Sequence, residues 1–231
     1  RHAVVVSVLA AESLARGSTA EAGKLCDSAA ELAHDERPAS FDLEEVRQRC
    51  VRVWLGSGGL ARARDEVQHL LDEVTRRYGA QHPAVADALL QRMVVELHSN
   101  RVDDAFETAR STVQLSERAH GPDDPRVIVG LINRAGTANM VGESAEALDI
   151  VGRAARIAQT SLPPDDPRQA QASCLAARLE GATNCDSDAT ERFVQACETA
   201  VAALEADGPR TRALAVANAA VGGRAYLADV Y

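Results

Sequence analysis

The sequence predicts an all-α fold: a right-handed superhelical solenoid built from antiparallel helix pairs. Two observations lead to this prediction. Turn-forming segments that close on a proline recur at a fixed period, and apolar residues return every three to five positions between them. No segment alternates apolar and polar residues between hairpin turns, so we expect no strand.

Prolines set the period of the repeat. They lie 42 residues apart without a gap, at Pro83, Pro125, Pro167 and Pro209. Proline is tolerated at the first position of a helix because the N–H there has no intrahelical partner. Asp124 and Asp166 precede two of these prolines and are good N-cap residues, and His82 and Gly208 hold the equivalent place before the other two. Each proline turn therefore predicts the start of a helix.

Alanines keep the same period and mark the second helix of each unit. They are Ala63, Ala105, Ala147 and Ala189, each shortly after a polar or glycine-containing break. The repeating unit is therefore a helix, a short turn, a helix and a proline turn. We expect a single array with pairs at 1–34, 41–78, 83–119, 125–160 and 167–206, then a terminal helix at 210–230. Since the chain starts at Arg1 without a methionine, we expect a fragment of a longer protein.

Composition narrows the possible partners. Hydrophobic residues make up 46% of the chain, aromatic residues only 3%, and the net charge is −9. This charge repels nucleic acid and anionic membranes, so neither is an expected partner. No stretch approaches the roughly 20 apolar residues that span a bilayer. We expect a cytoplasmic domain, although a parent protein could carry a membrane anchor outside this fragment.

The cysteines do not form a recognisable framework. They are Cys26, Cys50, Cys174, Cys185 and Cys197, an odd number without a CxxC pair. This pattern argues against a disulfide framework and favours a reducing compartment. Several lie at apolar helix positions, where a free cysteine acts as a small hydrophobic residue.

One copy of the repeat resembles a known family. Residues 82–98 (HPAVADALLQRMVVELH) are followed by an acidic-acidic-alanine opening at 103–105 and by Gly-Pro-Asp-Asp-Pro at 121–125. This pattern is similar to the 42-residue tetratricopeptide (TPR) variant of kinesin light chains and of bacterial multidomain proteins. The resemblance covers roughly residues 41–210. Arg92 and Glu96 depart from it, because both occupy places that the pattern keeps apolar.

The resemblance implies binding of peptides or partner domains in a concave groove. Stacked helix pairs form such a surface, and the first helix of each pair lines it. The candidate partner-binding residues are Gln48, Arg52, Asp87, Leu90, Val94, His98, Asn133, Asn139, Gln171, Arg178 and Arg224. The same face holds Leu55, Val129, Ile132, Gly136, Met140 and Cys174. This mixture favours an extended peptide or an amphipathic helix with an apolar anchor.

Other motifs are interpreted as structural. The carboxylate pairs at 123–124 and 165–166 repeat with the period, which favours helix capping over a metal or acid–base site. The glycine-rich segment 56–59 lacks the other features of a phosphate loop and is interpreted as a turn. No two histidines form HxxxH, and only His98 lies near the predicted groove. Trp54 is predicted to be a core residue, and we expect no catalytic residue, cofactor or metal.

The sequence leaves several functions open. The favoured hypothesis is a scaffold domain that binds proteins or peptides. The alternative is a regulatory sensor domain that binds a small molecule or signalling peptide and controls an attached kinase or transcription regulator. An enzyme is the third possibility, without a motif in its support. The apolar face of the helix at 210–230 predicts a homodimer or a domain contact.

Overall fold

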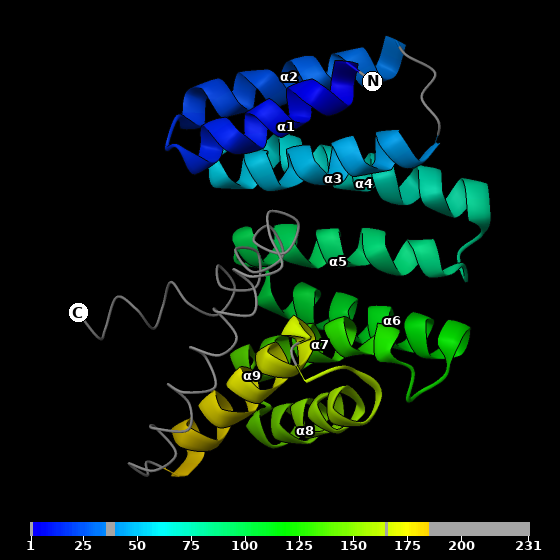
Figure 1. Ribbon diagram of the computed structural model, residues 1–231, viewed down its shortest axis with the longest axis vertical. Coiled ribbons are helices and arrows are strands. Elements are labelled where there is room, and N and C mark those ends of the chain that lie inside the picture. The colour runs from blue at the N-terminus through cyan, green and yellow to red at the C-terminus, as the bar shows by residue number, and fades with distance from the viewer. Residues whose placement is uncertain (1, 36–39, 165, 185–231) are drawn as a thin grey trace. The chain divides into compact units, whose positions relative to one another are not determined.

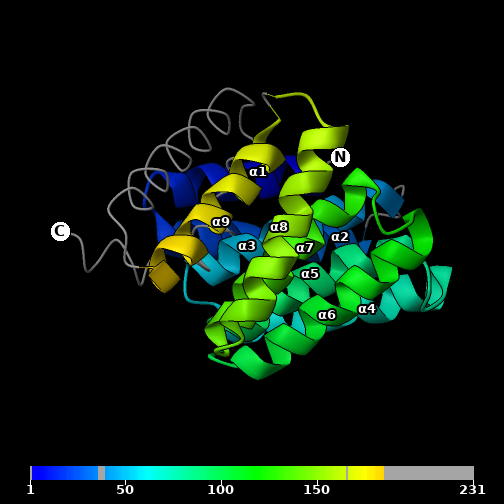
Figure 2. The same ribbon diagram turned by 90° about the horizontal axis from the view of Figure 1, so that it is seen from below.

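The computed structural model describes residues 2–35, 40–164 and 166–184, and all their regular secondary structure is helical. Contacts divide the chain into two compact units, Arg1–Arg101 and Val102–Tyr231. Figures 1 and 2 show the order of the helices within each unit. The predicted all-α fold is therefore confirmed, whereas the single continuous array stays a prediction. The second helix of the fifth pair, the helix at 210–230 and Arg224 lie outside the described residues.

The described residues of unit 1 form five helices. They are α1 (His2–Ala15), α2 (Thr19–Asp35), α3 (Ser40–Gly56), α4 (Leu60–Tyr78) and α5 (Pro83–His98). Consecutive helices pack against each other as antiparallel pairs, α1 with α2 and α3 with α4, and α5 packs on α4. Short turns force this arrangement, because a chain that reverses within a few residues places the next helix alongside.

Unit 2 follows the same plan over its described residues. It contains α6 (Val102–His120), the short 3₁₀-helix η1 (Pro125–Val127), α7 (Ile128–Met140), α8 (Ser144–Ser161) and α9 (Pro167–Asn184). The pair of α7 and α8 is packed on one side by α6 and on the other by α9. None of the described helices in either unit has the length and apolar character needed to cross a membrane.

The turns within the pairs depend on residues with positive φ. They are Gly17, Gly58, Asn100 and Gly142, with φ of 81°, 83°, 57° and 90°. Glycine adopts this conformation without steric cost, and asparagine is one of the few other residues that visits it. After Gly58, the N–H of Gly59 donates to the carbonyl oxygen of Trp54 at 2.7 Å and closes the end of α3. The predicted breaks before Ala63, Ala105 and Ala147 are thus confirmed as helix ends, and the break before Ala189 lies outside the described residues.

Side-chain caps are present at the three proline turns that the structure describes, including the two predicted at Asp124 and Asp166. The imidazole Nδ1 of His82 accepts a hydrogen bond from the N–H of Ala84 at 3.2 Å. The carboxylates of Asp124 and Asp166 each accept one from the backbone N–H two residues later, at 2.9 Å in both cases. Each bond satisfies one of the N–H groups that the first turn of a helix leaves without an acceptor.

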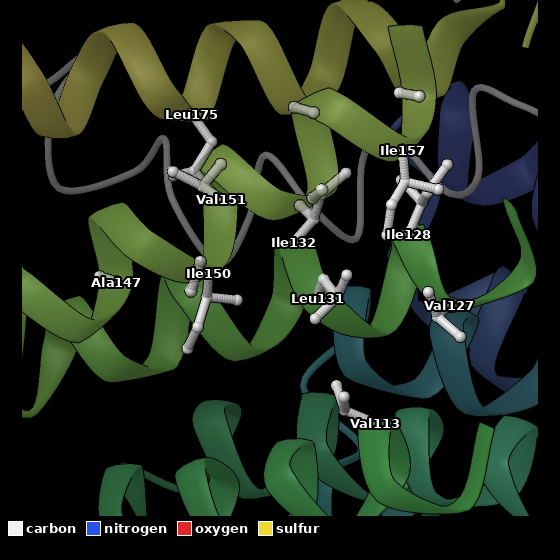
Figure 3. Close-up of a cluster of buried hydrophobic side chains, with 14 of the residues drawn as sticks. Val113, Val127, Ile128, Leu131, Ile132, Ala147, Ile150, Val151, Ile157 and Leu175 are labelled. Atoms are coloured by element: carbon white, nitrogen blue, oxygen red, sulfur yellow. The ribbon is translucent and has the colours of Figure 1, made fainter. Parts of the chain in front are cut away.

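Helix α1 and the α7–α8 pair bury side chains of different size. In the first pair of unit 1, α1 buries only small residues: Ala3, Ser7, Ala10 and Ser13. In unit 2, branched side chains of α7 and α8 meet, including Leu131, Ile132, Val151 and Ile157 (Figure 3). Trp54 is buried in the core of unit 1, as predicted.

Candidate functional site

Some of the candidate residues recur every 42 residues in the sequence, at the same position of successive first helices. We call each such set a column. One column contains Arg52 on α3, Val94 on α5, Gly136 on α7 and Arg178 on α9, all half-buried. The surroundings of Gly136 show which way a side chain at this position would point. A Cβ atom added there would meet nothing within 4 Å. On the same helix, a Cβ at Gly130 would lie 3.3 Å from the Val113 side chain of α6. Position 136 therefore opens away from the core of unit 2.

In unit 1, the candidates are spread over α3 and α5. Gln48 on α3 is half-buried, as are Leu90 and Val94 on α5, while Asp87 and His98 are exposed. Gln48, Arg52, Asp87 and His98 each interact with another group of the protein. A ligand at this surface would therefore exchange existing interactions for new ones.

In unit 2, the candidates lie around the open position of α7. Asn133 and Asn139 on α7 are half-buried, and so are Gln171 and Arg178 on α9. The Asn139 side chain accepts a hydrogen bond from the Ser144 hydroxyl at 3.3 Å, so this amide also holds the turn before α8. Met140 at the end of α7 is 47% exposed, an unusual exposure for a large apolar side chain.

The repeated carboxylates have a structural role. The guanidinium of Arg126 forms two bonds with the Asp124 carboxylate, both at 2.8 Å, and lowers the pKa of Asp124 well below its usual range. Arg168 holds Asp166 in the same way, at 2.9 Å and 2.7 Å, and lowers its pKa. Within the described ranges, no group of three or more potential metal-ligating side chains comes together.

The contact between Arg92 and Glu96 explains how two polar residues can occupy places that the repeat pattern keeps apolar. Glu96 is 3% exposed, and the Nε atom of Arg92 donates to its carboxylate at 2.8 Å. A buried carboxylate needs such a partner, because removing a charge from water costs several kcal/mol unless it is paired. One turn of α5 thus supplies the ion pair that makes this polar position tolerable.

Two of the cysteines behave as predicted. Cys26 and Cys50 are buried free thiols on α2 and α3, and the Cys50 thiol donates to the carbonyl oxygen of Cys26 at 3.7 Å. The Cys26 side chain and burial together raise the pKa of the Cys50 thiol, so it stays protonated and unreactive.

Cys174 departs from the expectation of free thiols. This residue on α9 is disulfide-bonded, and Cys185 and Cys197 lie outside the described residues. Spacing along the chain did not indicate this bond, because cysteines are brought together by folding. A disulfide is more usual in an oxidising compartment, so the cytoplasmic location stays a prediction.

Sequence reasoning missed a hollow on unit 1. It has a volume of about 440 Å³ and lies between the first half of α2 and the turn from α3 to α4. The glycine-rich segment 56–59 is a turn, as predicted, but residues 57–59 also line this hollow. The only sequence signal was a glycine within a helix, Gly23, which costs helix stability without an evident local reason.

These helices, turns and caps define a helical-repeat protein with a TPR-like fold. Among solved structures, the chain is similar to a Podosopora anserina protein described by its nearly identical TPR-like repeats of kinesin light chain type. The TM-score is 0.67 at 15% identity over 86% of this chain and 96% of that one. It is also similar to BtubC (BKLC) from P. vanneervenii, with a TM-score of 0.62 at 17% identity over 94% and 80% of the two chains.

At these identities the likeness concerns the fold alone. No family model matches the chain, and no curated protein matches it. The resemblance to the kinesin-light-chain-like TPR fold is confirmed, while a bacterial origin stays a prediction. Folds of this type usually bind proteins and are usually non-catalytic.

Proposed function

We propose that this chain is a scaffold domain that binds a protein or peptide through the outward faces of its first helices. The observation that supports it best is the open position at Gly136. A glycine inside a helix costs about 1 kcal/mol relative to alanine. No described residue comes within 4 Å of a Cβ atom at Gly136, so the packing of the described residues gives no reason for a glycine. A ligand that approaches the helix backbone would give one.

The surroundings of Gly136 suit a peptide. Met140 and the half-buried Val129 offer apolar contacts on the same side of α7, and Asn133 offers an amide. Apolar contacts would hold the side chains of an extended peptide or an amphipathic helix, and the amide can pair with a peptide backbone. The opposite face of α7 is fully used, since Ile128, Leu131 and Ala135 are buried in the core.

Selection from a random peptide library tests this proposal. Peptides selected on the wild-type chain are titrated against Gly136→Leu, which places a side chain in the open position. We expect binding at least about tenfold weaker, a change of about 1.4 kcal/mol. Arg52→Glu and Arg178→Glu test whether the same column of α3 and α9 contributes.

A graded variant and a control make the result specific. Gly136→Ala adds a methyl group in front of the helix backbone and is expected to weaken binding less than Gly136→Leu does, while Arg110→Glu changes a charge on the exposed side of α6 and is expected to leave binding unchanged. Binding that is unaffected by every substitution in the Gly136 column would contradict the proposed face. If no peptide is selected at all, the scaffold proposal fails and the regulatory sensor becomes the better hypothesis.

A further inference from the structure

The hollow on unit 1 is built from three segments of the chain. Thr19, Gly23 and Lys24 line it from α2, Trp54 and Ser57 from the end of α3 and its turn, and Arg62 from the start of α4. All of these belong to unit 1, and none belongs to the first-helix face proposed above. The hollow is therefore a separate feature that needs its own explanation.

Comparison of the repeats explains why the hollow exists. In each repeat, the turn between the two helices contains one residue with a positive φ. The sixth residue after it occupies the equivalent position on the second helix of that repeat. These residues are Gly23, Arg64, Phe106 and Leu148. Three repeats thus place a large side chain there, and only the first repeat has a glycine. The hollow includes the space that such a side chain would occupy next to α2.

The other repeats show how the position is normally filled. The guanidinium of Arg64 reaches the next turn of unit 1 and donates to the Ser99 hydroxyl at 3.4 Å. Phe106 and Leu148 are partly buried against the core of unit 2. At Gly23, a Cβ atom would lie 3.5 Å from the Ser57 hydroxyl, so this position also faces a turn but carries no side chain. At about 440 Å³, the hollow is larger than one arginine, phenylalanine or leucine side chain, and Gly23 leaves its α2 wall open.

The charged groups around the hollow favour some of these side chains over others. The Asp27 carboxylate at the hollow is already engaged, because it accepts from the Trp54 indole N–H at 3.1 Å and pairs with Arg62. Lys24, the only lysine of the chain, forms no ion pair with any residue that the structure describes. An uncompensated ammonium group beside the hollow disfavours a cationic side chain and favours a carboxylate.

We propose that this hollow binds a large aliphatic or aromatic residue of a peptide partner, with a carboxylate near that residue paired to Lys24. The partner supplies the side chain that Gly23 lacks, against walls that include Trp54 and Leu60. The carboxylate comes either from an adjacent acidic side chain or from the end of the peptide. This site is independent of the scaffold face on α7.

Trp54 provides the readout, because it is the only tryptophan of the chain and lines the hollow. The probes are N-acetyl-Leu-Glu-amide for a side-chain carboxylate, N-acetyl-Ala-Leu with a free terminus, and N-acetyl-Leu-Gln-amide as the neutral control. Probes this small bind weakly, so they are titrated to about 20 mM. We expect a saturable change in Trp54 fluorescence, about two- to fivefold tighter for a carboxylate probe than for the neutral probe.

Variants assign the response to the hollow. Gly23→Leu obstructs the hollow at its α2 wall and replaces a poor helix residue, so it is expected to abolish the saturable response without lowering the thermal unfolding midpoint. Ser28→Leu adds the same side chain to an exposed position of α2 that does not line the hollow, and is expected to leave the response unchanged. Lys24→Gln is expected to lower the affinity of the carboxylate probes to that of the neutral probe.

The outcomes separate this proposal from the scaffold function. A saturable response that persists in Gly23→Leu, or no saturable response to any probe, would overturn the proposed site. Equal affinity of carboxylate and neutral probes would overturn the role of Lys24. Peptides whose binding depends on Gly136 would still support the scaffold function in each of these cases.

Discussion

The first helix pair of unit 1 and the α7–α8 pair of unit 2 solve the same packing problem with side chains of different size. Helix α1 buries alanine and serine and leaves Val5 58% exposed, whereas α7 buries Ile128 and Leu131 completely or nearly so. Small buried residues let helix backbones approach closely, while branched residues fill a wider space. The repeat therefore fixes the order of helices and turns but not the volume between them.

The largest expected effect lies in the wider core. Leu131→Ala removes a buried branched side chain and leaves a cavity, so it should lower the free energy of unfolding by about 2–5 kcal/mol. Denaturant titration of the variant checks this value. Leu9→Ala, at an exposed position of α1, serves as the matched control and should cost much less. Equal losses at both positions would contradict the difference between the two pairs.

The tighter pair should respond to added volume instead. Ala10 is fully buried on α1, and Ala10→Leu should lower the free energy of unfolding by about 1–3 kcal/mol through overpacking. The same measurement on Val8→Leu, an exposed position of the same helix, provides the comparison. If Ala10→Leu were neutral, the backbones of α1 and its neighbours would not be as close as the buried alanines indicate.

A smaller effect concerns the proline turn before α9, which the first pair lacks. Arg168 lowers the pKa of Asp166 in the folded protein, so the charged carboxylate stabilises the fold above about pH 4, the usual pKa of a free aspartate. This contribution is lost as the pH falls through the lowered pKa. Asp166→Asn keeps a capping side chain and should be less stable than wild type at pH 7, by a difference that becomes smaller as the pH falls below about 4.

Unfolding midpoints measured across this range check the prediction. Asp149→Asn, on the exposed side of α8, controls for the general effect of removing one negative charge. A stability difference for Asp166→Asn that stays constant down to pH 2 would show that the ion pair with Arg168 is not its cause.

The smallest effect is expected at the open position of α7. Gly136→Ala should raise the free energy of unfolding by about 0.5–1 kcal/mol, since alanine restricts the unfolded chain and nothing obstructs the added methyl group. Thermal unfolding of the variant measures it. A loss of stability would mean that the space in front of Gly136 is filled, and would weaken the proposed binding face.

Much of the fold follows from local chemistry and was predictable. Proline, aspartate and glycine impose helix starts, caps and reversals within a few residues, so the turns at 56–59 and the cap at Asp124 could be located from the sequence. The candidate faces followed from the same period. Whether they bind a partner stays a prediction, because a column of half-buried residues does not by itself identify a ligand.

The sequence by itself determined the helix pairs, their turns and the caps at the proline turns, because each depends on residues close together in the chain. Only the tertiary structure decided that Glu96 is buried against Arg92, that Cys174 is disulfide-bonded, and that Gly23 leaves a hollow beside Lys24. These features depend on how deeply each side chain is buried and on which groups folding places next to it. The effect of the missing side chain at Gly23 can be recognised only in the packed structure, where the neighbouring helices and turns leave space beside it.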